Sequence, residues 1–259
     1  MDMGELIPEL APLALRTTVL SPTAGAPAVR ESSVGGPLLW PRGEEWPYCA
    51  VRGHGVPPDD VRNPLGRVPM VPVVQLFAAD VPEVVFPEGA DVLQLVWCTL
   101  LHADDPEAAV LPRLYWRNSA EVLAGGVLLD APAPQEGEYN EEFMPEPCTV
   151  SPTPVVEYPN WDMPEDVKPF VYPRIEEVEE RFGVYYTDVA CALQTKAGGY
   201  PVWNQPARWP SCGRGHRMEH LLSVTGDEEL DMVMGDCGGV YLFVCRECPG
   251  WPYAYRYDC

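Results

Sequence analysis

Cysteine and histidine recur at short separations in the C-terminal part of the chain. Cys212 is followed four residues later by His216, and Cys245 is followed three residues later by Cys248. Thiolate and imidazole are ligands that zinc prefers, and two close pairs brought together by a fold can complete a tetrahedron. Cys212, His216, Cys245 and Cys248 therefore form a candidate zinc site.

The N-terminal part of the chain carries pairs of the same kind. Cys49 precedes His54 by five residues, and Cys98 precedes His102 by four. Cys49, His54, Cys98 and His102 form a second candidate set. Four protein ligands leave no open position for water, so we expect one or two structural zinc ions that hold strands together and do not activate a nucleophile.

A plain alternative exists for each of these cysteines, because a cysteine at the end of an apolar strand is often an inert buried residue. Cys259, the last residue, could replace one of the zinc ligands. The other three cysteines lack partners at ligand spacing and are expected to be structural: Cys148, Cys191 and Cys237.

One enzymatic motif overlaps the C-terminal set. His216, Glu219 and His220 match H-x-x-E-H, in which a helix presents two zinc-binding histidines and a glutamate base. The corresponding segment of the N-terminal part contains Pro72 and is typical of a strand, where His216 and Glu219 would point to opposite faces. We therefore predict no catalytic residues and no enzyme, with a zinc-dependent hydrolase built on His216, Glu219 and His220 as the alternative.

An internal repeat places the two cysteine and histidine sets in equivalent positions. In each copy a Gly-Gly pair precedes a Trp-Pro-x-Cys turn by the same step, and a methionine opens the next strand. Met70 precedes Cys98 by 28 residues, and Met218 precedes Cys245 by 27. The repeat predicts a duplicated β-rich unit whose strands carry the candidate ligands.

The segments that position these ligands are short apolar runs bounded by Gly or Pro, which is typical of buried strands; they cover residues 71–77, 91–98 and 239–245. We predict an α+β fold that is mainly β, with two internally duplicated β-rich units, a few short helices and an acidic Pro-rich connector. The predicted boundaries are an N-terminal segment (1–33), a first repeat (34–130), a connector with a helix (131–195) and a second repeat (196–259).

The connector has an unusual composition. Residues 131–183 hold ten prolines and thirteen acidic residues against three basic ones, as expected of an extended solvated segment. It is predicted to end in one helix, with Pro173 in the first turn, Gly183 at the stop and one apolar face formed by Ile175, Val178 and Phe182.

Charge and composition limit the partners and the compartment. Seventeen basic and thirty-nine acidic residues give a formal charge of −22, which repels nucleic acid and anionic lipid and favours a basic protein partner. No apolar run approaches the roughly 18 residues that span a bilayer. Nine cysteines, an odd number, do not suggest a disulfide framework. We expect a cytoplasmic protein.

Residues 196–205, Lys-Ala-Gly-Gly-Tyr-Pro-Val-Trp-Asn-Gln, resemble the K-x-G-G-x-P-x-W-x-Q signature of the bacterial YwqG-like family, a domain of unknown function. The segments 35–41 and 238–245 fit the same pattern, so the resemblance spans roughly residues 34–259. The wider superfamily is similar to the programmed-cell-death-protein-2 group of dedicated ribosomal-protein chaperones. This resemblance implies a duplicated β-rich fold used for protein binding. The chain departs from that group's C-x-x-C-G motif, because Gly213 follows Cys212 and no second cysteine is present there.

These observations predict a cytoplasmic, zinc-stapled protein-binding module, chaperone-like or inhibitor-like (as in an immunity protein), for a basic partner protein. The competing interpretations are the zinc hydrolase and a protein whose acidity only maintains solubility.

Overall fold

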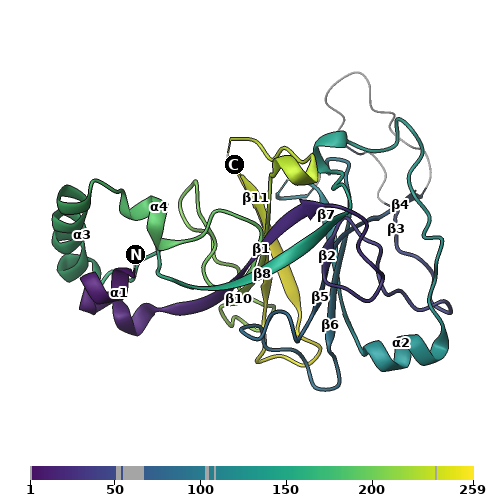
Figure 1. Cartoon of the computed structure of the whole chain (residues 1–259), viewed down its shortest axis with the longest axis horizontal. Coiled ribbons are helices and arrows are strands. Elements are labelled where there is room, and N and C mark those ends of the chain that lie inside the picture. Colours follow the sequence, from purple (N-terminus) through teal and green to yellow (C-terminus); the bar gives the residue numbers. More distant parts are fainter. Residues whose placement is uncertain (1, 51–53, 55–66, 103–104, 108, 237) are drawn as a thin grey trace. The chain divides into compact units, whose positions relative to one another are not determined.

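The computed structural model of the chain describes residues 2–50, 54, 67–102, 105–107, 109–236 and 238–259 (Figure 1). The chain divides into two compact units, and each is built from segments far apart in sequence. Unit 1 comprises Met1–Leu20, Pro152–Thr225 and Cys237–Cys259, and unit 2 comprises Ser21–Ser151 and Gly226–Asp236. Strands dominate and the helices are few and short, so the prediction of a mainly β fold is confirmed.

Unit 2 is built on an antiparallel sheet. Its strands follow the order β8 (Cys148–Glu157, of which the first four residues belong here), β2 (Ser33–Val34), β5 (Val71–Phe77), β6 (Val92–Cys98) and β7 (Leu111–Arg117). A second small sheet pairs β3 (Tyr48–Cys49) with β4 (Val68–Pro69). The short helical elements of this unit are α2 (Ser119–Gly125), η2 (Glu141–Phe143) and η3 (Glu228–Leu230). Every residue of β6 is buried, including Gln94, whose side-chain amide donates to the carbonyl oxygen of Leu39 and to the side-chain oxygen of Gln75 at 2.9 Å each.

The strands of unit 1 also pair in antiparallel fashion. They follow the order β12 (Tyr253–Asp258), β11 (Gly239–Val244), β10 (Glu219–Thr225), β9 (Lys196–Gly198) and β1 (Leu15–Ala24, of which the first six residues belong here). The helical elements are α1 (Met3–Leu6), η1 (Pro8–Leu13), α3 (Lys168–Phe182) and α4 (Tyr186–Ala190), whose apolar side chains share one buried cluster. None of the helices in the described part of the chain is long and apolar enough to cross a bilayer.

The three strands predicted from apolar runs are confirmed as β5, β6 and β11, each within one residue of its expected bounds. The helix predicted near residue 173 is longer than expected. It begins at Lys168 because Pro169 occupies the first turn, and Pro173 lies inside the helix. Gly183 ends it with a φ of 67°, as predicted, since glycine adopts this left-handed conformation without steric cost.

The two units share local irregularities at the positions that the repeat aligns. The register of β5 against β6 shifts between Pro72 and Val74, and the register of β10 against β11 shifts between His220 and Leu222. A β-bulge at the same point of each hairpin is compatible with duplication. Common origin of the units, and the repeat boundaries predicted from the sequence, stay predictions. The segment 131–195 contains η2, β8, α3 and α4.

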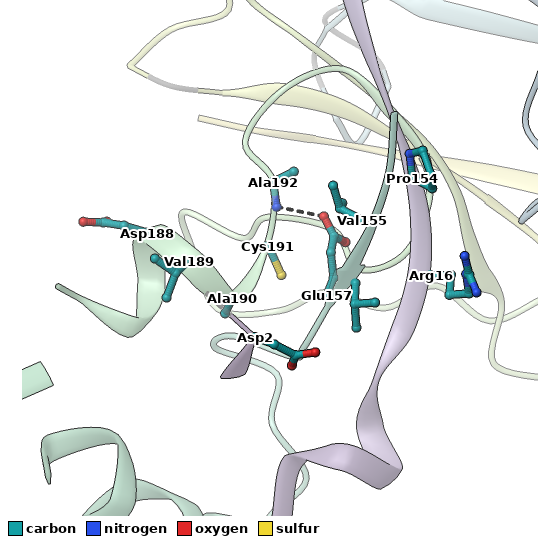
Figure 2. A pocket seen from close by; sticks show the side chains of 11 residues that line it. Asp2, Arg16, Pro154, Val155, Glu157, Asp188, Val189, Ala190, Cys191 and Ala192 are labelled. Carbon is teal, nitrogen blue, oxygen red and sulfur yellow. Dashed lines mark hydrogen bonds between the residues drawn. The ribbon is translucent and has the colours of Figure 1, made fainter. Parts of the chain in front are cut away.

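Glu157, the acidic member of a buried ion pair, lines a cavity of about 520 Å³ in unit 1 (Figure 2). The Glu157 carboxylate accepts hydrogen bonds from Lys196 Nζ at 2.6 Å and from the backbone N–H groups of Ala192 and Tyr200 at 2.8 and 2.9 Å. Neither charged side chain is more than 1% exposed. The carboxylate is therefore satisfied by its own unit, and it fixes β9 and the residue 190–192 turn to the end of β8.

Candidate metal centres

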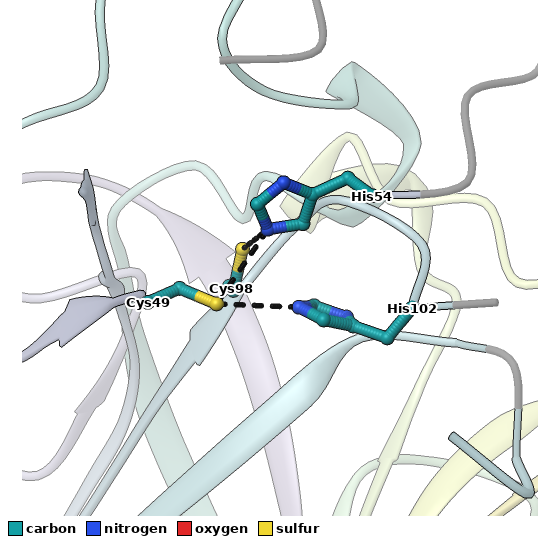
Figure 3. Close-up of side chains that lie close together, drawn as sticks. All are labelled: Cys49, His54, Cys98 and His102. Atoms are coloured by element: carbon teal, nitrogen blue, oxygen red, sulfur yellow. Dashed lines mark hydrogen bonds between the residues drawn. The ribbon is translucent and has the colours of Figure 1, made fainter. Parts of the chain in front are cut away.

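The N-terminal candidate ligands converge in unit 2 (Figure 3). Cys49 ends strand β3 and Cys98 ends strand β6, while His54 and His102 lie on the segments that follow these strands. The strands hold the two thiols from different sheets, and the imidazoles of His54 and His102 lie against these thiols. The structure thus brings together all four residues, and their ligand atoms lie within 4.8 Å of one another.

The distances between these atoms match the edges of a zinc tetrahedron. Cys49 Sγ lies 3.3 Å from His102 Nε2 and 3.6 Å from His54 Nε2, and Cys98 Sγ lies 3.8 Å from His54 Nε2. With Zn–S bonds of about 2.3 Å and Zn–N bonds of about 2.0–2.1 Å, tetrahedral geometry separates sulfur from nitrogen by about 3.6 Å. The unit 2 site has the dimensions that this ion requires.

The surroundings of the unit 2 site orient one imidazole and exclude water. All four side chains are buried, and both sulfur atoms belong to an apolar cluster that includes Trp46 and Met70. His102 Nδ1 lies 3.0 Å from the carbonyl oxygen of Ala109. With Nδ1–H donating to this carbonyl, the Nε2 lone pair is directed at the site, as second-sphere contacts do in metal proteins.

Two thiols in such a place are hard to ionise together. The hydrogen bond to the Cys49 sulfur, followed by burial, raises the pKa of Cys98 far above its usual range. A divalent cation removes this penalty, because it is bound by the thiolates and balances their charge. The electrostatics of the unit 2 site therefore favour a dication.

The C-terminal candidate ligands converge in unit 1. Cys212 and His216 lie in the connection that leads to β10, and Cys245 and Cys248 follow the end of β11. His216 Nδ1 lies 3.6 Å from Cys245 Sγ and 3.5 Å from Cys248 Sγ, and the sulfur atoms of Cys212 and Cys248 are 3.7 Å apart. Two sulfur atoms on a zinc tetrahedron lie about 3.8 Å apart, so these separations also fit the ion.

A tight turn presents Cys212 in the unit 1 site. The Cys212 N–H donates to the His216 carbonyl at 2.9 Å, and Gly215 makes the turn with a φ of 85°. The Arg214 N–H points at Cys212 Sγ from 3.4 Å. Burial alone would raise the pKa of Cys212, but the backbone N–H groups of Arg214 and His216 and the neighbouring thiols lower it to about 7. Its thiolate is thus available at neutral pH.

The two sites differ in exposure. The His216 side chain is 33% exposed and lies 3.9 Å from the exposed carboxylate of Glu247, whereas His54 and His102 are 3% exposed. The unit 1 site, with three thiols and one imidazole, lies at the surface. The unit 2 site, with two of each, lies inside the core.

The remaining cysteines stand apart from both groups. Cys148 and Cys191 are buried, and their thiols donate to the carbonyl oxygens of Glu229 and Tyr158, as suits structural residues. Cys259 is exposed and belongs to neither group. Cys237 lies outside the described residues.

The H-x-x-E-H segment forms a turn and a strand. Glu219 opens β10 and pairs with Arg246 at 2.7 Å on the exposed side. His220 is buried between the carbonyl oxygen of Gly198 and the hydroxyl of Ser223, at 3.0 and 2.9 Å. His216 faces Cys245 and Cys248 instead. Residues 216–220 therefore lack the helix on which this peptidase motif depends.

Sequence reasoning missed the Glu157 and Lys196 pair. Lys196 stood out only as the first residue of a signature, and Glu157 was one of thirteen acidic residues in a segment expected to be solvated. The sequence around Glu157, with Pro154, Val155 and Val156 before it and Tyr158 after it, gave no indication that this carboxylate is buried. Only the packing of three distant segments brings the two charges together.

Comparison with known proteins gives a family and no activity. Residues 32–247 match the family described as a domain of unknown function (DUF1963). No curated protein matches the chain significantly. Because the match covers most of the 259 residues and includes all eight candidate ligands except Cys248, the chain belongs to the DUF1963 family.

Proposed function

We propose that this protein is a zinc-stapled protein-binding module, chaperone-like or inhibitor-like, that works in the cytoplasm on a basic partner protein. The single observation that carries the zinc part is the spacing of the donor atoms. The donor-atom separations in both sites, from 3.3 to 3.8 Å, are those expected around a tetrahedral ion with sulfur and nitrogen ligands.

A closed four-ligand set supports a structural role. In unit 2 the ion would join β3 to the end of β6, and in unit 1 it would join the turn before β10 to the end of β11. Because the ligands converge only in the folded chain, the binding free energy of the ion is also folding free energy. The ions would therefore hold binding surfaces in shape and take no part in a reaction.

The charge of the protein supports a basic partner. The formal charge is −22, and α3 presents exposed glutamates, of which Glu176 and Glu180 have no ion-pair partner among the described residues. Such a surface accelerates encounter with a cationic partner and adds affinity at low ionic strength.

Exposed aromatic side chains lie in the same stretch of unit 1. Trp161, Phe170 and Tyr185 are 64%, 67% and 70% exposed. Aromatic residues are enriched at binding hot spots, and their faces attract guanidinium and ammonium groups. Arg181 already stacks on the ring of Phe182 at 5.0 Å, which illustrates the contact that a basic partner could make here.

The state of the cysteines supports a reducing compartment. All eight cysteines in the described part of the chain have free thiols, and seven of them are buried. Thiol ligands persist in the cytoplasm, where disulfides are rare.

The test begins with capture of the partner from the native host and its identification. Affinity for that partner is then measured between 50 and 500 mM salt, roughly a threefold change in Debye length. Glu176→Lys with Glu180→Lys should slow association at least several-fold. The matched control is Glu88→Lys with Glu136→Lys, which makes the same charge change at exposed positions of unit 2.

Equal effects of both double variants would show that only net charge matters and would remove α3 from the interface. Binding that is unchanged by salt and by both double variants would contradict the electrostatic proposal. A hydrolytic activity lost in Glu219→Gln with zinc retained would replace the binder by the enzyme.

A further inference from the structure

The two sites offer their sulfur atoms very differently to solvent. In unit 2, Cys49 and Cys98 are 0% exposed within their apolar cluster. In unit 1, Cys212 and Cys248 are 7% and 6% exposed, Cys245 is 2% exposed, and the imidazole of His216 opens to water. A small polar oxidant therefore reaches the unit 1 site and is excluded from the unit 2 site.

Two of the unit 1 thiols are also placed to react with one another. Cys212 and Cys248 are the more exposed of the three, their sulfur atoms are 3.7 Å apart, and they lie in separate turns. Formation of a disulfide needs a sulfur separation of about 2.05 Å, a closure of less than 2 Å. Surface turns can make this adjustment more easily than packed strands can.

We propose that Cys212 and Cys248 are an oxidation site, at which a hydroperoxide forms a disulfide and releases the zinc ion of unit 1 while unit 2 keeps its own. The inference rests on the zinc ions of the proposed function and adds a modification to one of them. It makes the two ions unequal: one is a permanent staple, and the other is held only while its thiolates stay reduced.

The chemistry balances with hydrogen peroxide as the oxidant. One thiolate attacks the peroxide, the O–O bond breaks, and a sulfenic acid and hydroxide form. The second thiolate attacks the sulfenic sulfur, forms the S–S bond and expels a second hydroxide. Two sulfur atoms are oxidised by one electron each, and the peroxide takes up both electrons. The ion then keeps only Cys245 and His216 and dissociates.

The experiment uses the full chain with Cys259→Ser, which removes the exposed thiol that belongs to neither site. Metal analysis first counts the zinc ions. Hydrogen peroxide is then titrated in the presence of a zinc-chelating dye, and the alkylated peptides are mapped by mass spectrometry. We expect release of one of the two zinc ions and a disulfide between Cys212 and Cys248. Reduction with dithiothreitol and addition of zinc should then restore the zinc content to two ions.

Release of both ions together would overturn the inference, as would retention of both until the thiols become sulfonic acids. A disulfide between Cys49 and Cys98, or between Cys245 and Cys248, would also overturn it. These results leave the zinc-staple proposal intact, because the initial count still shows two ions. A count of zero before peroxide is added would instead refute that proposal together with this inference.

Discussion

At the scale of single residues, both candidate sites gather buried thiols, two in unit 2 and three in unit 1, whose negative charge a bound cation would balance. Cys98 cannot ionise easily beside Cys49, so without a cation the thiols of the unit 2 site would stay neutral and their partners would be the imidazoles of His54 and His102. Substitution of a ligand cysteine should therefore lower the metal content, whereas substitution of another buried cysteine should not.

Cys98→Ser should lower the zinc content from two ions to one and reduce the melting temperature by several degrees or more, because metal binding and folding are coupled. Cys148→Ser is the matched control, since Cys148 is equally buried but belongs to neither candidate metal site. Zinc content is measured by elemental analysis and stability by thermal unfolding. Equal zinc in the two variants would show that Cys98 is no ligand.

His220 gives a pH dependence whose sign follows from its burial. Burial, followed by the charge of Lys196, lowers the pKa of His220 to about 3. An unfolded histidine titrates near pH 6.5, so between about pH 6.5 and 3 the unfolded chain binds more protons than the folded one. The free energy of unfolding should therefore fall as pH drops below about 6.5.

His220→Gln removes this titration and keeps an amide that can bond to Gly198 and Ser223. Between pH 6.5 and 5 the free energy of unfolding should fall less steeply with decreasing pH in the variant than in the unmodified protein. The two slopes should differ by at most about 1.4 kcal/mol per pH unit, the contribution of one titrating group. Denaturant unfolding of both proteins at a fixed zinc excess measures the slopes. Identical slopes would mean that His220 does not titrate on unfolding in this range.

Residue types and spacing were enough to predict the groups that the structure brings together. A cysteine and a histidine four or five positions apart supply only two ligands, and the structure joins distant pairs into two groups of four residues. Burial of Glu157 with Lys196 was beyond the sequence, because it depends on packing between β8 and β9 and has no local pattern.

At the scale of elements, helix α3 shows which local signals are reliable. The apolar positions Val171 and Val178 face the cluster of unit 1, and Gly183 ends the helix where expected. The start was predicted too late because two prolines, Pro169 and Pro173, lie about one turn apart, and either can occupy a first turn.

Gly183→Ala should lower stability by roughly 1 kcal/mol, because its φ of 67° is unfavourable for a residue with a Cβ. The space around the added carbon is open, so the cost is conformational. Gly43→Ala is the control, since Gly43 has open space and no left-handed φ. Chemical denaturation gives both values. An equal loss of stability in Gly43→Ala would show that the loss comes from the replacement of glycine by alanine in general and not from the left-handed conformation of Gly183.

Three strands, β5, β6 and β11, were predicted to within a residue because they are short, predominantly apolar runs bounded by Gly or Pro. The partners of β1 and β8 were not predictable in the same way. Both are long and half-exposed, and their pairing depends on segments more than a hundred residues away.

At the scale of the whole molecule, the proposed zinc ions would stabilise each of the two units. A strong chelator such as EDTA in excess should lower the melting temperature by about 10 °C or more, because each structural ion contributes several kcal/mol in small zinc domains. The loss should be reversed by added zinc and not by magnesium, which does not prefer thiolate ligands. An unchanged melting temperature, with zinc shown to be removed, would make the ions dispensable for folding.

The interleaving of the two units sets an order for their completion during synthesis. Unit 2 needs residues 226–236 and unit 1 needs residues 237–259, although both begin near the N-terminus. The nascent chain therefore exposes Cys49, His54, Cys98 and His102 on the ribosome long before Cys245 and Cys248 emerge. The internal site can therefore be loaded while translation continues, and the surface site can be assembled only later, once Cys245 and Cys248 have been synthesised.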